Sequence, residues 1–327
     1  MISDAIQKPL AAWTSMDRYQ DQEIPCLTVI FRSGGCSWNQ CLMCGYRFER
    51  SSTKKPDELL AELRGQLRWV AENHPRDSYA MVKIFTSGSF FDPQEVPPAF
   101  RTDVAALFAG KVVIAETRTE YVEEESLVAF REALQADGDA ALYVAMGLET
   151  TNDYIREKCI RKGLTFDDFK EAVAVARQAD VGIKTYLMMK PPFLTEREAL
   201  DDMKQSIRDV IPYSDIISMN LCTVQTRTEV EHYWKQGSYR PPYLWSALDA
   251  LLSTDHYVQC DPVGGGKRRG PHNCGVCDRE IVEAITTYVS TGNQIHLRRC
   301  VDAGCACVDE WRHVLKNEEP WCMPLTK

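Results

Sequence analysis

From Leu27 onward, short apolar runs alternate with longer stretches in which apolar residues recur every three or four positions. The short runs predict buried strands, and the longer spacing predicts helices with one buried face. The predicted strands are Leu27–Phe31, Met81–Phe85, Val112–Glu116, Leu142–Met146, Ile183–Met188 and Ile216–Asn220. The predicted helices are Pro56–Glu72, Pro98–Phe108, Glu123–Gln135, Thr151–Lys158, Phe166–Gln178 and Glu196–Val210. This order indicates an α/β fold with a parallel sheet.

Six strand–helix units in succession predict a partial, open (β/α)6 barrel. The interior of a closed eight-stranded barrel is filled by side chains, whereas six strands leave room for a large substrate. In either case the functional loops follow the carboxyl ends of the strands. The alternation then gives way to a helical stretch at Trp245–Leu252, a strand-like run at His256–Cys260 and a cysteine-rich tail. We therefore expect an N-terminal segment (1–24), a barrel (25–240) and a metal-binding C-terminal extension (241–327).

Composition narrows the class of protein. A chain of 327 residues, 44% hydrophobic and 26% charged, can bury a large core. No run approaches the roughly 20 apolar residues that span a bilayer, and the first ten residues lack the pattern of a secretion signal. We expect a cytoplasmic protein without a membrane contact. The net charge of -9 argues against an all-over nucleic-acid-binding surface, but it leaves room for a local one.

The thirteen cysteines are unevenly distributed along the chain. Without a secretion signal, such a number favours metal binding over disulfides. Three lie between positions 36 and 44, and five lie between 274 and 307. The others are expected to be small buried residues: Cys26, Cys159, Cys222, Cys260 and Cys322.

The first cysteine cluster follows the first predicted strand. Four residues separate Cys36 from Cys41, two separate Cys41 from Cys44, and glycines flank the loop. Thiolates are the usual ligands of a [4Fe–4S] cluster, which takes four. Three ligands leave one iron open to bind another molecule, as an open position does in catalytic zinc sites. The alternative is a zinc knuckle with a remote fourth ligand.

This loop after a first strand resembles the radical S-adenosylmethionine superfamily. The resemblance implies that the open iron binds the methionine part of S-adenosylmethionine and that cofactor cleavage yields a 5′-deoxyadenosyl radical. The four-residue spacing between the first two cysteines is typical of a minority of subfamilies. At the end of the second strand, Thr86, Ser87, Gly88 and Ser89 match the place where the superfamily holds the methionine amine. The alternative there is a generic turn.

Side chains at the next strand ends complete the candidate cofactor site. Glu116 and Arg118 resemble a stretch of Elongator-like radical enzymes, and a carboxylate there could bind ribose; the alternative is a surface salt-bridge cluster. Glu149, in Gly-Leu-Glu-Thr, and the basic Arg-Lys-Gly downstream resemble a signature of Elongator-like and methylthiotransferase enzymes, which modify tRNA. Met188, and Met43 inside the cysteine loop, are expected beside the adenine; plain core packing is the alternative.

The tail holds a second cysteine group. A Cys-x-x-Cys pair with a remote Cys-x-Cys pair would form a closed tetrahedral site of a structural kind. The favoured zinc ligands are Cys274, Cys277, Cys305 and Cys307, with Cys300 or His272 as substitutes. The alternative is an auxiliary iron–sulfur cluster.

All these motifs together resemble the radical subunits of archaeosine synthase, from about Pro25 to Trp311. The resemblance implies a lyase that cleaves the carbon–nitrogen bond of a lysine adduct on a 7-deazaguanine base of tRNA. It also implies a partner subunit that attaches the lysine, and an external electron donor. The alternatives are a thiolating or carboxymethylating radical tRNA enzyme, or a non-catalytic iron–sulfur or zinc module that binds tRNA.

Overall fold

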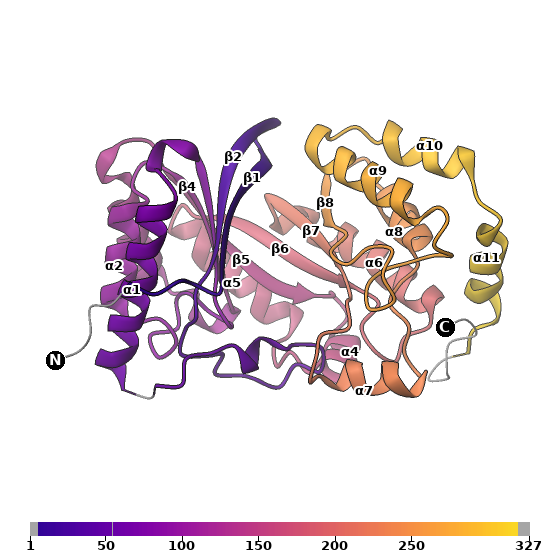
Figure 1. Ribbon diagram of the computed structural model, residues 1–327, viewed down its shortest axis with the longest axis horizontal. Coiled ribbons are helices and arrows are strands. Elements are labelled where there is room, and N and C mark those ends of the chain that lie inside the picture. The colour runs from indigo at the N-terminus through magenta and orange to yellow at the C-terminus, as the bar shows by residue number, and fades with distance from the viewer. Residues whose placement is uncertain (1–5, 54, 320–327) are drawn as a thin grey trace. The chain divides into compact units, whose positions relative to one another are not determined.

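The computed structural model describes residues 6–53 and 55–319 (Figure 1). Within them, eight strands follow one another in chain order in one sheet. The strands are β1 (Ala11–Tyr19), β2 (Gln22–Ile30), β3 (Met81–Phe85), β4 (Val112–Thr117), β5 (Ala141–Glu149), β6 (Gly182–Met189), β7 (Ile216–Leu221) and β8 (Val258–Asp261). The six predicted strands correspond to β2–β7, and the last strand-like run corresponds to β8. The α/β fold class with a cysteine-rich C-terminal extension is confirmed.

Helices connect most of these strands. They are α1 (Pro56–Asn73), α2 (Pro98–Leu107), α3 (Glu124–Leu134), α4 (Asp153–Ile155), α5 (Phe166–Gln178), α6 (Glu196–Val210), α7 (Glu229–Gln236), α8 (Leu244–Leu251), α9 (Asp278–Thr291), α10 (Ile295–Ala303) and α11 (Cys307–Asn317). None of the helices in the described part of the chain is long and apolar enough to cross a membrane.

The chain divides into two compact units. Unit 1 comprises Met1–Asn39, Tyr46–Gly147 and Asp167–Lys184, and unit 2 comprises Gln40–Gly45, Leu148–Phe166 and Thr185–Lys327. The boundaries expected from the sequence, after residues 24 and 240, remain a prediction.

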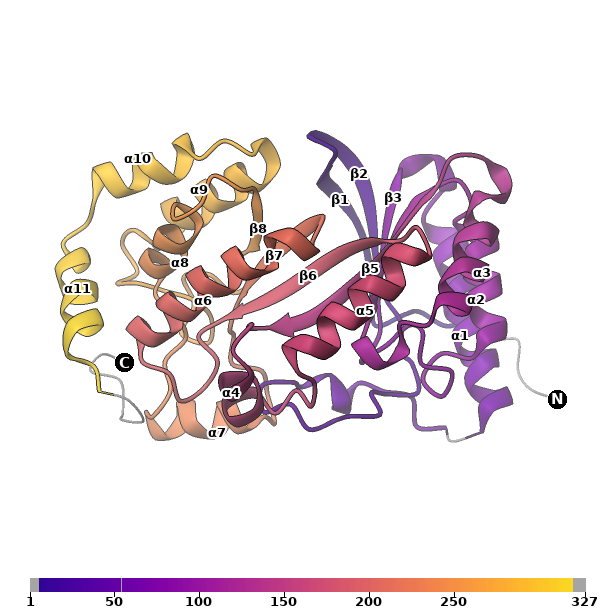
Figure 2. The same cartoon turned by 180° about the vertical axis from the view of Figure 1, so that it is seen from behind.

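Unit 1 contains the first strands of the sheet. β2, β3 and β4 pair in parallel, and β4 pairs in parallel with β5. Leu27 and Val29 of β2 are fully buried, as their apolar run predicts. Helices α1, α2 and α3 lie beside one another, with α2 in contact with both neighbours (Figure 2). This parallel order brings the loops after β2, β3 and β4 to one edge of the sheet.

Strand β1 lies in the segment for which the sequence predicted no regular structure. It pairs with β2 in an antiparallel hairpin, in which Tyr19 faces Gln22. The two turn residues, Gln20 and Asp21, have φ values of 46° and 63°. Such left-handed turns match the twist of a hairpin but usually contain Asn or Gly, so the sequence carried no clear turn signal.

Unit 2 contains β7 and β8, which pair in parallel. Helix α6 packs against α8 and α11, and α9 packs against α10 and β8. The predicted cap of α6 is present, because Thr195 and Glu198 form a reciprocal capping box. The predicted helix Thr151–Lys158 is instead the single turn α4 followed by a π-helical turn at Arg156–Ile160.

The π-helical turn has a physical cause in Arg156. This residue is fully buried, and its guanidinium donates to the carbonyl oxygens of Thr150 and Leu164. A wider turn suits these bonds better than a regular helix would. The isolated cysteines Cys26, Cys159, Cys222 and Cys260 are buried as expected, and Cys322 lies outside the described residues.

Candidate cofactor and metal sites

The first cysteine cluster is divided between the units, with Cys36 in unit 1 and Cys41 and Cys44 in unit 2. In unit 1, Cys36 lies directly against Gly88 in the loop after β3. A Cβ atom added to Gly88 would lie 2.6 Å from Cys36 Cβ and 2.7 Å from Cys36 Sγ. Real Cβ atoms do not approach so closely, so only glycine fits here. Two motifs separated by fifty residues therefore meet at the carboxyl ends of neighbouring strands.

A buried carboxylate that the sequence analysis missed holds this loop. Glu95 Oε1 accepts from the backbone N–H groups of Ser87 and Gly88 at 2.8 and 2.9 Å, and Oε2 accepts from the N–H of Ser89 at 2.8 Å. The Ser33 hydroxyl donates to Oε1 at 2.6 Å. Burial raises the pKa of Glu95 above its usual value, and the hydrogen bonds from Ser33 and Ser89 offset only part of this rise.

The bonds to Glu95 decide what the loop can offer a ligand. Three successive N–H groups are occupied, so its carbonyl and hydroxyl oxygens are the groups that remain. Within the described residues, Ser87 Oγ and Asp92 Oδ2 are buried without a hydrogen-bond partner. Buried polar atoms normally have partners. Acceptors of this kind fit a ligand with several donors, such as the ammonium group of S-adenosylmethionine.

The residues after β4 are tied to the same loop. The Phe90 N–H donates to the Glu116 carbonyl at 2.8 Å, and the Arg118 N–H donates to Ser89 Oγ at 3.0 Å. The Arg118 side chain is 5% exposed and pairs with Glu120 at 2.5 Å. Its guanidinium carbon lies 5.4 Å from the centre of the Trp38 ring. Arg118 is thus a buried group of unit 1 that forms an ion pair with the more exposed Glu120.

In unit 2, the segment Gln40–Gly45 is held by backbone bonds. The Leu42 N–H donates to the Ile160 carbonyl at 3.0 Å, and the Gly45 N–H donates to Gln225 Oε1 at 2.6 Å. A turn brings the Cys44 N–H to within 3.3 Å of the Cys41 carbonyl oxygen.

The predicted adenine-side residues meet in this part of unit 2. Met43 is buried in a cluster with Ile160 and Cys222, and both Cys41 and Met188 pack against that cluster. Two methionines from distant parts of the sequence are thus placed beside a predicted iron ligand. The arrangement allows apolar contacts to a flat ring, although it also serves as core.

Glu149 ends β5 in a left-handed conformation, with a φ of 69°. Its carboxylate pairs with Lys162 Nζ at 2.8 Å, and both side chains are largely buried. Lys162 lies in the basic Arg-Lys-Gly motif downstream of Glu149, and the sequence analysis predicted no role for this residue. The ion pair fixes the Glu149 carboxylate at a strand end, where it can accept hydroxyl groups.

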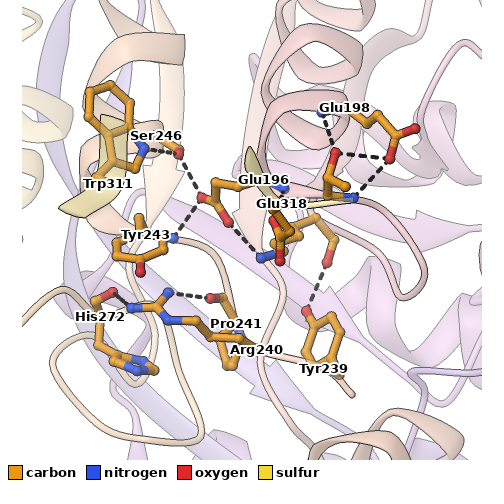
Figure 3. A network of polar contacts seen from close by, with 12 residues as sticks. Glu196, Glu198, Tyr239, Arg240, Pro241, Tyr243, Ser246, His272, Trp311 and Glu318 are labelled. Atoms are coloured by element: carbon orange, nitrogen blue, oxygen red, sulfur yellow. Dashed lines mark hydrogen bonds and ion pairs between the residues drawn. The ribbon is translucent and has the colours of Figure 1, made fainter. Parts of the chain in front are cut away.

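A second buried ion pair follows β6 (Figure 3). Lys190 Nζ lies 2.6 Å from Glu196 Oε2, and the two side chains are 2% and 0% exposed. Glu196 Oε1 also accepts from the Tyr243 N–H at 2.8 Å and from Ser246 Oγ at 2.6 Å. Trp311 Nε1 donates to Ser246 Oγ in turn. This network, which the sequence did not reveal, joins β6 to helices α8 and α11.

The four favoured tail cysteines come together between the start of α9 and the start of α11. The sulfurs of Cys274, Cys277, Cys305 and Cys307 all lie within 4.8 Å of one another and could hold a metal ion. Two sulfur pairs are 3.8 and 3.7 Å apart, Cys274 with Cys305 and Cys277 with Cys307.

The two substitutes named from the sequence lie outside the group of four sulfurs. Cys300 lies outside this group, with its sulfur 4.0 Å from the Glu280 carbonyl oxygen. His272 Nδ1 lies 2.7 Å from the Gly270 carbonyl oxygen.

Hydrogen-bond donors approach three of the four sulfurs, while burial raises the pKa of the Cys277 thiol well above its usual value and that of Cys307 to about 11. Trp245 Nε1 donates to Cys307 Sγ at 3.2 Å, and Asn273 Nδ2 donates to Cys277 Sγ at 3.4 Å. Burial raises the pKa of the Cys274 thiol, but the backbone N–H groups of Val276 and Cys277 outweigh it and lower the pKa to about 7. Donors directed at sulfur stabilise the thiolate, which is the metal-binding form.

Comparison with known protein sequences identifies the family of this chain. The chain is 41% identical over 325 residues to a protein of Methanosarcina acetivorans named archaeosine synthase subunit beta, and the match covers 95% of this chain and 91% of that protein. The chain belongs to the archaeosine synthase subunit beta family. A member from Thermococcus kodakarensis is 33% identical over 319 residues, covering 93% of this chain and 96% of that protein. The resemblance inferred from the sequence is confirmed.

Other comparisons add little to the family assignment. No protein-family model matches the chain. A solved structure of Elp3 from Methanocaldococcus infernus, lacking its N-terminus, has a TM-score of 0.47 and 15% identity, and covers 71% of this chain and 58% of that one. For a member of the archaeosine synthase subunit beta family, the Glu95 and Glu196 networks are the main features that the sequence did not reveal.

Proposed function

We propose that this chain is the radical subunit of an archaeosine synthase, an S-adenosylmethionine-dependent lyase that acts on tRNA. Membership of the archaeosine synthase subunit beta family supports a role in archaeosine biosynthesis. The observation that carries the radical chemistry is the contact between Cys36 and Gly88, which joins a predicted iron ligand to an acceptor-rich loop.

The proposed cofactors are a [4Fe–4S] cluster held by Cys36, Cys41 and Cys44, and S-adenosylmethionine. Together they supply a 5′-deoxyadenosyl radical when bound and reduced by an external donor. The remaining residues bind and orient S-adenosylmethionine. Oxygens of the loop Thr86–Ser89 and the unpaired acceptors Ser87 Oγ and Asp92 Oδ2 would receive the methionine ammonium.

The other predicted residues would hold the rest of the cofactor. Glu149, fixed by Lys162, and Glu116 would accept ribose hydroxyls, and Arg118 would order the pocket. Met43 and Met188 would contact the adenine and exclude water from it. Each of these roles remains a proposal that single substitutions can test.

The proposed substrate is a tRNA in which lysine is joined through its side-chain nitrogen to a 7-deazaguanine base. A partner subunit would attach that lysine. This chain would remove hydrogen from the lysine carbon next to the nitrogen, after which the carbon–nitrogen bond breaks. Water supplies the oxygen of the released aldehyde, and the nitrogen stays on the base as the archaeosine amidine. The two electrons that the lysine carbon loses would be balanced by the conversion of S-adenosylmethionine to methionine and 5′-deoxyadenosine, so the external donor would start the reaction without a net loss of electrons.

We propose zinc for the tail site. A tetrahedral zinc ion with Zn–S bonds of about 2.3 Å holds its sulfurs roughly 3.8 Å apart. Two of the sulfur pairs lie at 3.8 and 3.7 Å. A [4Fe–4S] cluster binds its thiolates through four different irons, so its ligands stand farther apart. A closed site with four ligands would be structural, which disfavours the thiolating alternative because sulfur insertion calls for an auxiliary cluster.

Anaerobic reconstitution tests the proposed reaction. The chain is supplied with iron, sulfide, dithionite, S-adenosylmethionine and tRNA carrying the lysine adduct, and the nucleosides are analysed by mass spectrometry. We expect archaeosine and 5′-deoxyadenosine from the wild type. Substituting Cys36, Cys41 or Cys44 by Ala should abolish both products, whereas the buried Cys159→Ala, as a matched control, should form them.

Three results would count against parts of this account. Activity retained in any of the three loop variants contradicts the ligand assignment. A sulfur-containing nucleoside would indicate a thiolating enzyme instead. No 5′-deoxyadenosine from the wild type would contradict radical chemistry altogether.

A further inference from the structure

Unit 1 contains a cavity of about 590 Å³ that none of the proposed cofactor contacts uses. Its wall is formed by the start of β1, the end of β2 with Arg32, and the segment Tyr46–Arg50 that follows the cysteine loop in the sequence. The volume lies in the range of roughly 300–1,000 Å³ that is typical of ligand sites. We propose that this cavity binds an unstacked nucleotide of the tRNA, an inference that rests on the proposed function.

The cavity wall is held in place by hydrogen bonds. The buried side chain of Gln66 accepts from the Arg32 N–H at 2.8 Å and donates to the Arg32 carbonyl at 3.1 Å. The Gln66 side chain therefore forms the pair of backbone hydrogen bonds that a neighbouring strand would form, at a residue beyond the end of β2. The Ser51 N–H donates to the Ser33 carbonyl at 2.8 Å, which fixes the end of the other wall.

The wall also borders the segment that carries the first cysteine. Arg50 crosses Gly35, where an added Cβ would lie 2.7 Å from Arg50 Cδ. Gly35 has a φ of 99°, which favours glycine for a second reason. Because Gly35 directly precedes Cys36, a nucleotide held against Arg50 would lie beside the proposed cluster loop.

The side chains of the wall match the chemistry of a nucleotide. Tyr46 and Phe48 are 43% and 48% exposed. The Arg47 guanidinium carbon lies 5.1 Å from the centre of the Phe48 ring. Rings with exposed faces stack on unpaired bases, which is the usual way in which proteins recognise single-stranded RNA.

The arginines supply the charge that a phosphate needs. Arg32 and Arg50 are exposed, and in the described part of the chain neither side chain forms an ion pair. Glu49 offsets one of these charges at the same cavity. On a chain with a net charge of -9, two arginines without carboxylate partners beside exposed rings form a local surface for a polyanion.

Binding of an unmodified tRNA transcript, followed by fluorescence anisotropy at several salt concentrations, tests the arginines. Arg32→Gln with Arg50→Gln should weaken binding about tenfold or more and reduce the slope of log Kd against log salt by roughly 1–2. The control double variant, Arg279→Gln with Arg312→Gln, removes the same charge from exposed helical sites and should bind within about twofold of the wild type.

Photocrosslinking tests the position. A tRNA transcript with 4-thiouridine in its D-loop is irradiated with the full-length chain, and the crosslinked peptides are identified by mass spectrometry. We expect crosslinks within residues 46–50, and their loss together with roughly tenfold weaker binding in Tyr46→Ala and Phe48→Ala. Crosslinks confined to other segments would overturn the proposal, as would wild-type affinity in the Arg32 and Arg50 double variant.

Two further outcomes also decide against this site. If the wild-type chain binds no tRNA, or if the variants lose a protein partner while keeping tRNA, the cavity is not a nucleotide site. The proposed function is tested separately, by whether the wild-type chain converts the lysine adduct. If the wild type converts the lysine adduct but the variants bind tRNA normally, only the cavity assignment fails.

Discussion

Gly88→Ala should prevent binding of the proposed iron–sulfur cluster without unfolding the chain. The added Cβ would lie 2.6 Å from Cys36 Cβ and 2.7 Å from its sulfur. Carbon atoms in ordinary contact lie about 3.5–4.0 Å apart, so Cys36 must move by about 1 Å. Metal sites tolerate deviations of only about 0.2 Å in ligand distance. The backbone N–H that donates to Glu95 is kept, so the loop itself has reason to stay in place.

The substitution should affect the stability of the chain and the binding of the cluster to different extents. Overpacking of this kind costs about 1–3 kcal/mol of stability, which a chain of this size can withstand. Cluster binding should suffer far more, because one of the three proposed ligands is displaced. We expect iron bound after anaerobic reconstitution to fall by half or more from about four per chain, with loss of the visible absorption of the cluster.

Gly182→Ala is the matched control. An added Cβ there would overlap the ring of Tyr143 in the sheet of unit 1, away from any cysteine of the loop. It should destabilise the chain at least as much as Gly88→Ala while leaving the iron content unchanged. Full iron content and normal cofactor cleavage in Gly88→Ala would refute the reasoning about Cys36.

Three further substitutions test other parts of the structure. Glu196→Gln leaves the buried Lys190 ammonium unpaired and should cost about 3–5 kcal/mol in urea unfolding, whereas Asp201→Asn in an exposed pair should change stability by less than about 1 kcal/mol. Cys274→Ser should release one equivalent of zinc and lower the midpoint of thermal unfolding by roughly 5–10 °C; zinc loss without that shift would contradict a structural role. Burial raises the pKa of Asp202 from 3.8 to about 6. The unfolded chain then holds fewer protons than the native chain between those values, and stability falls as pH rises from about 4 to 6. Asp202→Asn should therefore stabilise the chain by about 1–2 kcal/mol at pH 7.5 and by much less at pH 4.5, and an equal effect at both would refute the assignment.

The order of strands and helices along the chain was largely predictable, because apolar runs directly indicate buried parallel strands. Leu27 and Val29 of β2 show this, since both are fully buried in the run that predicted them. Strand β1 was missed because none of its residues is buried and its turn, Gln20 and Asp21, has no glycine or asparagine. Sequence patterns do not predict a strand such as β1, because it forms through pairing with its neighbour β2 and not through its own residue preferences.

The candidate sites were predictable only where residue chemistry is restrictive. Thiols at short spacing have few uses, so the sequence pattern pointed to the four tail cysteines whose sulfurs the structure brings together. Glu95 could not be found in this way, because a single glutamate in a sequence has no distinctive partner until the loop Ser87–Ser89 folds around it. The Lys190 and Glu196 pair was hidden for the same reason.

The most direct test of the central claim is mass spectrometry of tRNA nucleosides from cells that lack the gene. If this chain is the radical lyase of archaeosine synthesis, archaeosine should disappear and the lysine-adducted 7-deazaguanine nucleoside should accumulate in its place. A plasmid copy of the wild-type gene should restore archaeosine, and a Cys36→Ala copy should not. Normal archaeosine in the deletion strain, or loss of archaeosine without accumulation of the adduct, would contradict the account.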